Sequence, residues 1–317
     1  MIDKYKDAPW LIYDKNRQDT FSRMVARPIV TTGMKWTLGN LTGRSERQYV
    51  VVPSGYKMTS VRTGDVDSYL IIKRKFDIDL VGSKDKIILY FHGGGFYSGG
   101  GFYSQFTGCQ IVSQMRIPSL SVDYRLAPEH QYPAPIEDGI EAYKKLLYWG
   151  YKPKNIIFSG DSSGGNISLA LPQLLRGEGL PFPGAIIVFS PAADLDFSFD
   201  KYADNEYVSS TDPIIPLTTI EKVLQSYTSE DHYKDPCVSP VYGDLTDYPP
   251  TYICVDQDEV LLKGALEMGR RLYETGIPVK VHVSHNLYHI FPIITPMLPE
   301  SKKVFEEIND FLKENGF

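Results

Sequence analysis

The sequence predicts an α/β fold in which a mostly parallel central sheet carries helices on both faces and a helical cap at one end. Between residues 87 and 283, short segments rich in Ile and Val alternate with longer segments whose apolar residues recur at three- and four-residue steps. Most of the short segments are apolar nearly throughout, which is typical of parallel strands covered on both faces. Alternation of strands and helices then requires right-handed crossovers within one sheet.

The expected strands follow one another with helix-length connections between most of them. Two earlier segments, richer in polar residues, are expected to lead the sheet as edge strands, for which antiparallel pairing is open. The strands of the alternating part are 87–91, 119–122, 156–159, 185–190, 251–255 and 279–283, and the leading strands are 49–52 and 69–72.

Helices are predicted where the apolar spacing changes. Residues 136–147 and 261–272 each carry one apolar stripe, and Gly276 and Pro278 end the second of these helices. A third helix is expected to open after the strand at 156–159, with residues 166–171 in it.

Two segments do not fit the alternation: residues 1 to about 45 and 194 to about 236, the second with a helical piece at 217–227. Structureless loops of this length are uncommon inside compact domains, so we expect cap elements within a single domain that spans 1–317. Their aromatic residues suit either the wall of a small apolar pocket or the core. These residues are Trp10, Trp36, Phe197, Phe199, Tyr202 and Tyr207.

Composition excludes several classes of protein. The chain of 317 residues has 33 Lys and Arg against 39 Asp and Glu, a net charge of −6, which argues against a general nucleic-acid binder. Three scattered cysteines provide neither a disulfide framework nor a four-ligand zinc site. The N-terminus interleaves charges where a signal peptide needs an apolar stretch, and no apolar run is long enough to span a membrane. We therefore expect a cytoplasmic protein.

The strongest functional motif is Gly160-Asp-Ser-Ser-Gly164, which fits G-x-S-x-G with Ser162 at its centre. It follows a predicted strand and opens a predicted helix, so the serine would project from the sheet edge on a tight turn flanked by glycines. The alternative is a Gly/Ser turn that only links strand to helix. The flanking elements favour a nucleophile, Ser162.

A second motif, His92-Gly-Gly-Gly-Phe96, comes directly after the strand at 87–91. Consecutive glycines allow backbone amides to approach a substrate, as an oxyanion hole requires. We assign the hole to the amides of Gly94, Gly95 and Ser163. A phosphate-binding loop is the rival interpretation, but no Gly-Lys-Ser/Thr follows.

The serine needs a base, and His289 is the best candidate of six histidines because it stands shortly after the last predicted strand. His285 is its nearest competitor. The pair could also suggest a metal site, but no third ligand is near, so no metal or other cofactor is expected. The orienting acid is expected in the loop after 251–255, where Asp256, Asp258 and Glu259 are all candidates.

Taken together, the motifs resemble the hormone-sensitive-lipase branch of the α/β-hydrolases, a family of carboxylesterases. The resemblance covers most of the chain from about residue 85 onward. It rests on His92-Gly-Gly-Gly, Asp123-Tyr-Arg-Leu-Ala-Pro-Glu-His130 with Tyr132-Pro-Ala-Pro135, Gly160-Asp-Ser-Ser-Gly-Gly-Asn166, Ser190-Pro-Ala-Ala-Asp194 and Asp258-Glu-Val-Leu-Leu262.

The resemblance implies an α/β-hydrolase fold and selects Glu259 as the triad acid, with Asp258 as runner-up. It also implies that four charged residues form a buried structural network that braces the oxyanion loop, not a set of reactants. These residues are Asp123, Arg125, Glu129 and Asp138.

The expected function is that of a serine carboxylesterase that hydrolyses short-chain acyl esters through an acyl-enzyme. The partner is a small-molecule ester, without nucleic acid or membrane, and the resemblance allows a homodimer. The alternatives are an amidase, lactonase or deacetylase on the same triad, or a non-catalytic small-molecule receptor on the same scaffold. The presence of His289 disfavours the receptor.

Overall fold

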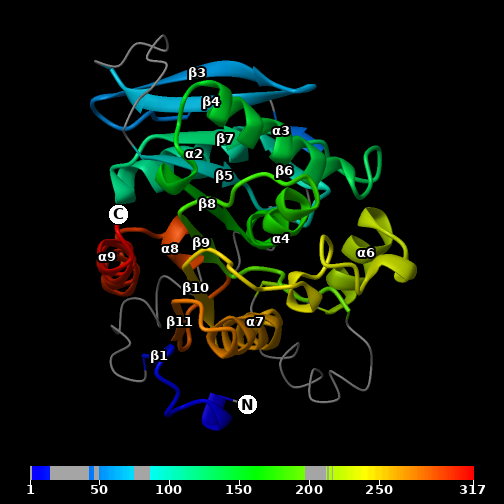
Figure 1. Cartoon of the computed structure of the whole chain (residues 1–317), viewed down its shortest axis with the longest axis vertical. Coiled ribbons are helices and arrows are strands. Elements are labelled where there is room, and N and C mark those ends of the chain that lie inside the picture. Colours follow the sequence, from blue (N-terminus) through cyan, green and yellow to red (C-terminus); the bar gives the residue numbers. More distant parts are fainter. Residues whose placement is uncertain are drawn as a thin grey trace.

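The computed structural model describes residues 2–14, 43–45, 50–74, 86–196, 212, 214–215 and 217–317. Within these ranges, one nine-stranded sheet has the order β1-β11-β10-β9-β8-β5-β7-β4-β3, and β2 pairs separately with β6 (Figure 1). The strands are β1 Leu11–Tyr13, β2 Gly43–Ser45, β3 Tyr56–Thr63, β4 Val66–Lys73, β5 Ile87–Phe91, β6 Ser98–Gly101, β7 Ser119–Val122, β8 Ile156–Asp161, β9 Ala185–Phe189, β10 Thr251–Asp256 and β11 Val279–Ser284.

The pairing is parallel from β1 through β7 in sheet order, and antiparallel where β4 joins β7 and β3 joins β4. The expected α/β class with a mostly parallel sheet is therefore confirmed. Strands β5, β7, β8, β9 and β10 are buried along their whole length, which explains why β5 and β9 are apolar throughout.

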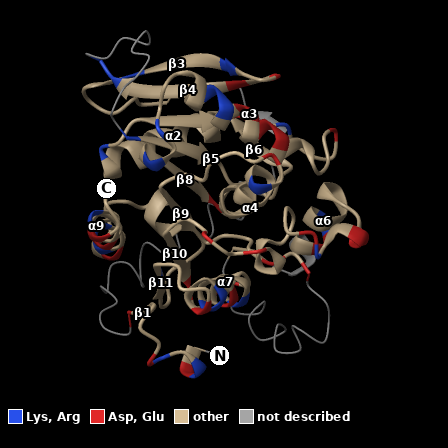
Figure 2. Cartoon of the chain, viewed as in Figure 1, with Lys and Arg blue, Asp and Glu red and all other residues tan. Residues whose placement is uncertain are grey.

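Helices cover both faces of this sheet (Figure 1). Helices α3, α4 and α7 lie against one face, and α2, α8 and α9 lie against the other. The helices are α2 Phe102–Met115, α3 Ala134–Tyr148, α4 Ser163–Gly177, α6 Leu217–Tyr227, α7 Leu262–Glu274, α8 Phe291–Ile294 and α9 Pro299–Glu314. Charged residues of both signs lie along α7 and α9 (Figure 2).

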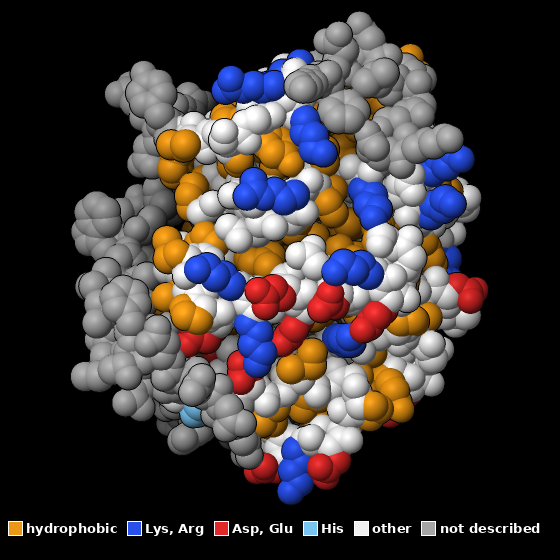
Figure 3. Space-filling view, turned by 90° about the vertical axis from the view of Figure 1, so that its left-hand side faces the viewer, with side chains coloured by type: hydrophobic (Ala, Val, Ile, Leu, Met, Phe, Trp, Pro, Cys, Tyr) orange, Lys and Arg blue, Asp and Glu red, His pale blue; other side chains and the backbone are white. Residues whose placement is uncertain are grey.

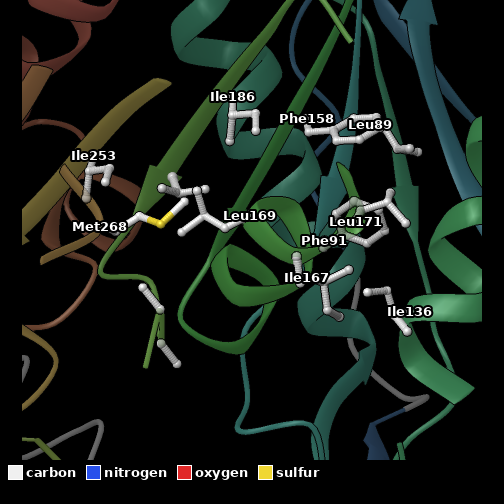
Figure 4. Close-up of a cluster of buried hydrophobic side chains, with 14 of the residues drawn as sticks. Leu89, Phe91, Ile136, Phe158, Ile167, Leu169, Leu171, Ile186, Ile253 and Met268 are labelled. Atoms are coloured by element: carbon white, nitrogen blue, oxygen red, sulfur yellow. The ribbon is translucent and has the colours of Figure 1, made fainter. Parts of the chain in front are cut away.

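The larger core fills the space between the sheet and α3, α4 and α7 (Figure 4). Phe91 and Phe158 from adjacent strands meet edge to face there. Ile167 of α4 is buried near Phe91, and Leu169 of α4 lies near Met268 of α7, which extends the cluster toward β10. Rigid packing on this scale fixes the strand ends, and the candidate site is built on those ends.

Several sequence predictions need correction. Residues 50–52 have no regular structure, so the strand expected over 49–52 is wrong in its described part, and the leading strand is β3 instead. As an edge strand, β3 is only partly buried, so its polar residues hide its apolar pattern. Helices α2 and α9 are not among the elements that the sequence analysis expects.

The expected cap falls partly on the described residues. β1 lies within the N-terminal cap segment but joins the main sheet beside β11. Trp10 is buried in the core, next to Tyr5 and to Gly269 of α7. Helix α6 forms as expected over 217–227. The other cap aromatics, Trp36, Phe197, Phe199, Tyr202 and Tyr207, lie outside the described residues.

Candidate active site

Ser162 lies on the sharp turn between β8 and α4. Its φ of 55° and ψ of −120° place a non-glycine residue in sparsely populated backbone space. Backbone hydrogen bonds hold this conformation: the Ser162 amide donates to the Phe189 carbonyl (2.9 Å), and the Ser162 carbonyl accepts from the amides of Ala192 (3.2 Å) and Asn166 (3.1 Å). The turn therefore projects Ser162 beyond the carboxyl edge of the sheet.

The glycines of the G-x-S-x-G motif are required by close backbone approach. A Cβ on Gly164 would overlap the carbonyl oxygens of Phe91 and His92 at the end of β5. A Cβ on Gly160 would in turn overlap the backbone of Gly164. The start of α4 can therefore pack directly against the neighbouring strand, which brings Ser162 beside the loop that follows β5.

That loop carries the triple glycine. A Cβ built on Gly93 would lie 3.1 Å from the Ser162 Cβ, so the loop passes directly beside the serine. Gly94 has a φ of +121°, and a side chain there would overlap Ser98. The amides of Gly94, Gly95 and Ser163 donate to no acceptor in the described part of the chain. They are available to a substrate oxygen.

His92 and Tyr124 brace the glycine loop from behind. Their rings stack with centroids 4.2 Å apart, and the Tyr124 hydroxyl donates to the His92 carbonyl (2.7 Å). His92 is fully buried, and its Nδ1 lies 2.7 Å from the Gly93 carbonyl. These contacts make His92 a structural part of the loop.

His289 and Glu259 form a buried pair. The imidazole Nδ1 lies 2.6 Å from the Glu259 Oε2. The other carboxylate oxygen, Oε1, accepts from the Ser190 hydroxyl (2.7 Å) and from the Asp256 amide (2.7 Å). Glu259 thus has three donors and no solvent exposure, so its position is fixed.

The pair changes the basicity of the imidazole. Burial of the ring lowers the pKa of His289, but the charge of Glu259 and the hydrogen bond to it act in the opposite direction. The charges of Asp212 and Asp161 add to this effect. The net pKa of His289 is raised above its usual 6.5, so the ring is a stronger base than a free histidine.

Ser190 connects the histidine–glutamate pair to the serine turn. Its hydroxyl donates to Glu259 and accepts from the amide of Ile290, the residue after His289 (3.0 Å). The neighbouring Phe189 holds the Ser162 amide. Ser162, Glu259 and His289 follow β8, β10 and β11, and these strands lie close together in the sheet. The three predicted residues therefore gather at one edge.

Other predicted residues lie apart from this group. Arg125 pairs with Asp138 through two nitrogens, with Nε 3.0 Å from Oδ2 and Nη2 2.9 Å from Oδ1. Asp123 is buried and accepts from the Gly101 amide (3.0 Å). Glu129 is exposed, so the expected buried network is wrong for this residue. It lies in a turn that leaves the sheet before α3, where its carboxylate is accessible to water.

Two further side chains at the site were not assigned a role from sequence. Ser190 ends the apolar run of β9, and its position after a strand and before Pro191 was the available signal. Asp161 is fully buried behind Ser162 and accepts from the hydroxyls of Tyr90 (2.6 Å) and Tyr103 (3.0 Å). Among the described residues, no group of three His, Cys, Asp or Glu side chains is arranged to hold a metal ion.

Comparison with known families and curated proteins gives consistent matches. A family described as alpha/beta hydrolase fold matches residues 88–293. An esterase from Acinetobacter venetianus is 30% identical over 236 residues, which cover 74% of this chain and 77% of that protein. An acetyl-hydrolase from Streptomyces hygroscopicus is 28% identical over 228 residues, which cover 72% and 75%.

Solved structures extend the likeness to the whole fold. An esterase from the bacterial hormone-sensitive lipase family superposes with a TM-score of 0.76 at 26% identity, covering 90% of this chain and 97% of that one. EstE5, in a crystal soaked with p-nitrophenyl butyrate, gives a TM-score of 0.74 at 27% identity, covering 96% and 94%.

Proposed function

Because this chain belongs to the alpha/beta hydrolase fold family, we propose that it is a serine carboxylesterase that hydrolyses short-chain acyl esters. The nucleophile is Ser162, the base is His289 and the orienting acid is Glu259. The observation that carries this proposal is the buried 2.6 Å contact between Glu259 and the Nδ1 of His289. It leaves the Nε2 of the same ring for the serine hydroxyl.

Acylation begins when the Ser162 hydroxyl attacks the ester carbonyl and His289 takes its proton. Glu259 stabilises the imidazolium that forms and holds the ring in the required tautomer. The negative charge that develops on the carbonyl oxygen is stabilised by the amides of Gly94, Gly95 and Ser163. His289 then gives the proton to the leaving alcohol, and water repeats the sequence on the acyl-enzyme.

The preference for short acyl chains rests on two supports. The motifs resemble a family of carboxylesterases, and the similar proteins include an acetyl-hydrolase and a structure soaked with a butyrate ester. We therefore expect turnover of p-nitrophenyl acetate and butyrate, with rates that decline beyond about six to eight carbons as the acyl pocket fills.

A p-nitrophenyl ester series on purified protein tests the proposal. The Ser162→Ala variant should lose activity by a factor of order 10⁶, the loss typical of a missing triad nucleophile. Ser163→Ala keeps its backbone amide and should remain active, which makes it the matched control. Wild-type rates in Ser162→Ala would show that the nucleophile is wrong, and equal rates on long-chain esters would refute the chain-length preference.

A further inference from the structure

A second buried carboxyl group, that of Asp256, lies at the end of β10 without a place in the triad. Its side chain has no solvent exposure. In the sheet register Asp256 is opposite Ser284, at the last paired position of β10 and β11. Its Oδ2 accepts from the Ser284 hydroxyl (2.7 Å) and the Leu287 amide (3.0 Å), and its Oδ1 accepts from the Asp258 amide (3.1 Å).

These contacts join the two loops that carry the acid and the base. Leu287 is two residues before His289, and Asp258 is directly before Glu259. The backbone amide of Asp256 also donates to the Glu259 Oε1 (2.7 Å). Asp256 therefore contacts both the loop that carries His289 and the loop that carries Glu259.

We propose that Asp256 is a positioning residue, whose carboxylate ties the histidine loop (284–289) to the acid loop (256–259) and thereby sets the His289–Glu259 hydrogen bond. This inference rests on the proposed esterase function for its kinetic consequences, although the hydrogen bond itself can be observed without turnover. Misplacement of a catalytic group by about 1 Å costs on the order of 10²-fold in rate, so such a tie affects kcat rather than KM.

The charge state of Asp256 matters for this role. As a carboxylate it accepts all three donors, whereas a protonated carboxyl turns one acceptor oxygen into a donor. Burial raises the pKa of Asp256 to about 7, with contributions from Glu259 and Asp258, against the hydrogen bond from Ser284. Acidification from pH 8 to pH 6 should therefore loosen the tie.

Two neighbours of Asp256, Tyr13 and Cys254, have a raised pKa. Burial raises the pKa of Tyr13 of β1 above its usual 10, and the charge of Asp256 acts in the same direction. Cys254 of β10 also feels it, and burial raises the pKa of the thiol well above 9. Both groups stay neutral between pH 6 and 8. Protonation of Asp256 and of His289 then both contribute to the loss of activity on the acid side.

The test compares Asp256→Asn and Ser284→Ala with the wild type. Asparagine has one acceptor oxygen, so it must present an amino group to at least one donor. We expect kcat on p-nitrophenyl acetate to fall about 10- to 100-fold with KM little changed. In Asp256→Asn, the acid limb of the pH–rate profile should depend on one protonation rather than two. Ser284→Ala removes one donor but keeps the charge, so it should show a smaller loss and retain a two-proton limb.

The far-downfield proton resonance of the His289–Glu259 hydrogen bond gives a readout that does not need turnover. It should be sharp in the wild type, and shifted or broadened in both variants, most in Asp256→Asn. An unchanged resonance and pH profile in a folded Asp256→Asn protein would overturn the inference. If that variant does not fold, an unchanged resonance in Ser284→Ala would overturn it. A wild type with the resonance but without ester turnover would count against the proposed function alone.

Discussion

The backbone of Ser162 is held in a conformation that costs about 1–3 kcal/mol for a residue with a side chain. The strain persists because Phe189 and Ala192 hold the turn through hydrogen bonds and because Gly164 packs against β5. The result is a hydroxyl presented beside the glycine loop. Backbone strain and close packing together thus fix the position of the Ser162 hydroxyl oxygen.

Glu259 gives the clearest residue-scale prediction. In Glu259→Gln, kcat on p-nitrophenyl butyrate should fall by about 10³–10⁴-fold, because an amide group facing Nδ1 favours the wrong tautomer of His289. The charge of Glu259 raises the pKa of His289, so its loss should lower that pKa. The base is then neutral at lower pH, and the acid limb of the pH–rate profile should move to lower pH.

Asp258→Asn is the matched control for this substitution. It removes a carboxylate from the adjacent position but keeps the backbone amide that donates to Asp256. Its kcat should stay close to that of the wild type, and its acid limb should move less than that of Glu259→Gln, because Asp258 is among the smaller contributions to the pKa of Asp256. A large loss of activity in Asp258→Asn together with an active Glu259→Gln would show that Asp258, and not Glu259, is the triad acid.

Helix α6 packs on the glycine loop that follows β5. Phe96, directly after the glycines, stacks on Tyr227 at the end of α6 with ring centroids 3.7 Å apart. A Cβ on Gly95 would lie 3.0 Å from the Val223 Cγ2 on the same helix. We therefore expect α6 to keep the oxyanion loop in place.

A pair of substitutions at Tyr227 separates its ring from its hydroxyl. The ring is fully buried, and the hydroxyl has no hydrogen-bond partner among the described residues. Tyr227→Phe should therefore leave the free energy of unfolding unchanged or slightly higher, whereas Tyr227→Ala should lower it by about 3–5 kcal/mol. Urea unfolding measures both values. Equal destabilisation by Phe and Ala would show that the hydroxyl, not the stack, holds the helix.

Helix α9 is attached to the sheet by a polar cluster in which His282 and Tyr252 are buried and Glu307 is partly buried. The Glu307 carboxylate lies 2.8 Å from the His282 Nδ1 on β11 and accepts from the Tyr252 hydroxyl of β10 (2.8 Å). Burial raises the pKa of Glu307, but the hydrogen bond and charge of His282 outweigh it, and the net pKa is lowered. The folded state therefore favours the ionised form.

The sign of the resulting pH dependence follows from that shift. Stability from Glu307 is present above its unfolded pKa of about 4.3 and is lost as the pH falls through the lower folded pKa. Glu307→Gln should cost about 1–3 kcal/mol at pH 7, and the difference from the wild type should shrink below pH 4. Denaturant unfolding at several pH values measures it.

Glu314→Gln on the same helix is the control for Glu307→Gln. Glu314 pairs with Lys280 at the surface (2.7 Å), where ion pairs contribute about 0–1 kcal/mol. A Glu307→Gln cost no larger than that of Glu314→Gln at pH 7 would contradict the proposed anchor.

The extent of burial decides which elements of the fold can be predicted from the sequence. Burial on both faces makes several inner strands largely apolar, and the sequence predicts them for that reason. It predicts α3 and α7 because one face of each helix is buried. The edge strand β3 and the helix α2 were missed because partial burial and Gly, Ser and Thr residues weaken the pattern. Pairing along an edge depends on backbone hydrogen bonds, which leave little trace in side-chain type.

The same distinction applies to the site. Ser162 and the glycine loop could be predicted because sharp turns and close backbone approach restrict residue type. Local sequence alone left Asp256, Asp258 and Glu259 equal as candidates, since the choice depends on where the loop meets His289. The structure brings Glu259 to the imidazole and turns Asp256 toward Ser284 and Leu287.

Charged side chains of both signs lie on the face of the molecule that Figure 3 shows. On the face in Figure 3, basic side chains are spread over the upper part and intermix with acidic ones across the middle, with hydrophobic side chains between them. Among the described residues, no helix is long and apolar enough to cross a membrane.

We propose that chain segments after β8, β10 and β11 converge to activate the hydroxyl of Ser162. Covalent capture tests it most directly: the protein is incubated with a fluorophosphonate, digested, and the modified peptide is located by mass spectrometry. We expect one adduct, on Ser162, that is absent in Ser162→Ala and forms more slowly in Glu259→Gln. A wild-type protein that stays unlabelled, or that carries the adduct on another residue, would contradict it.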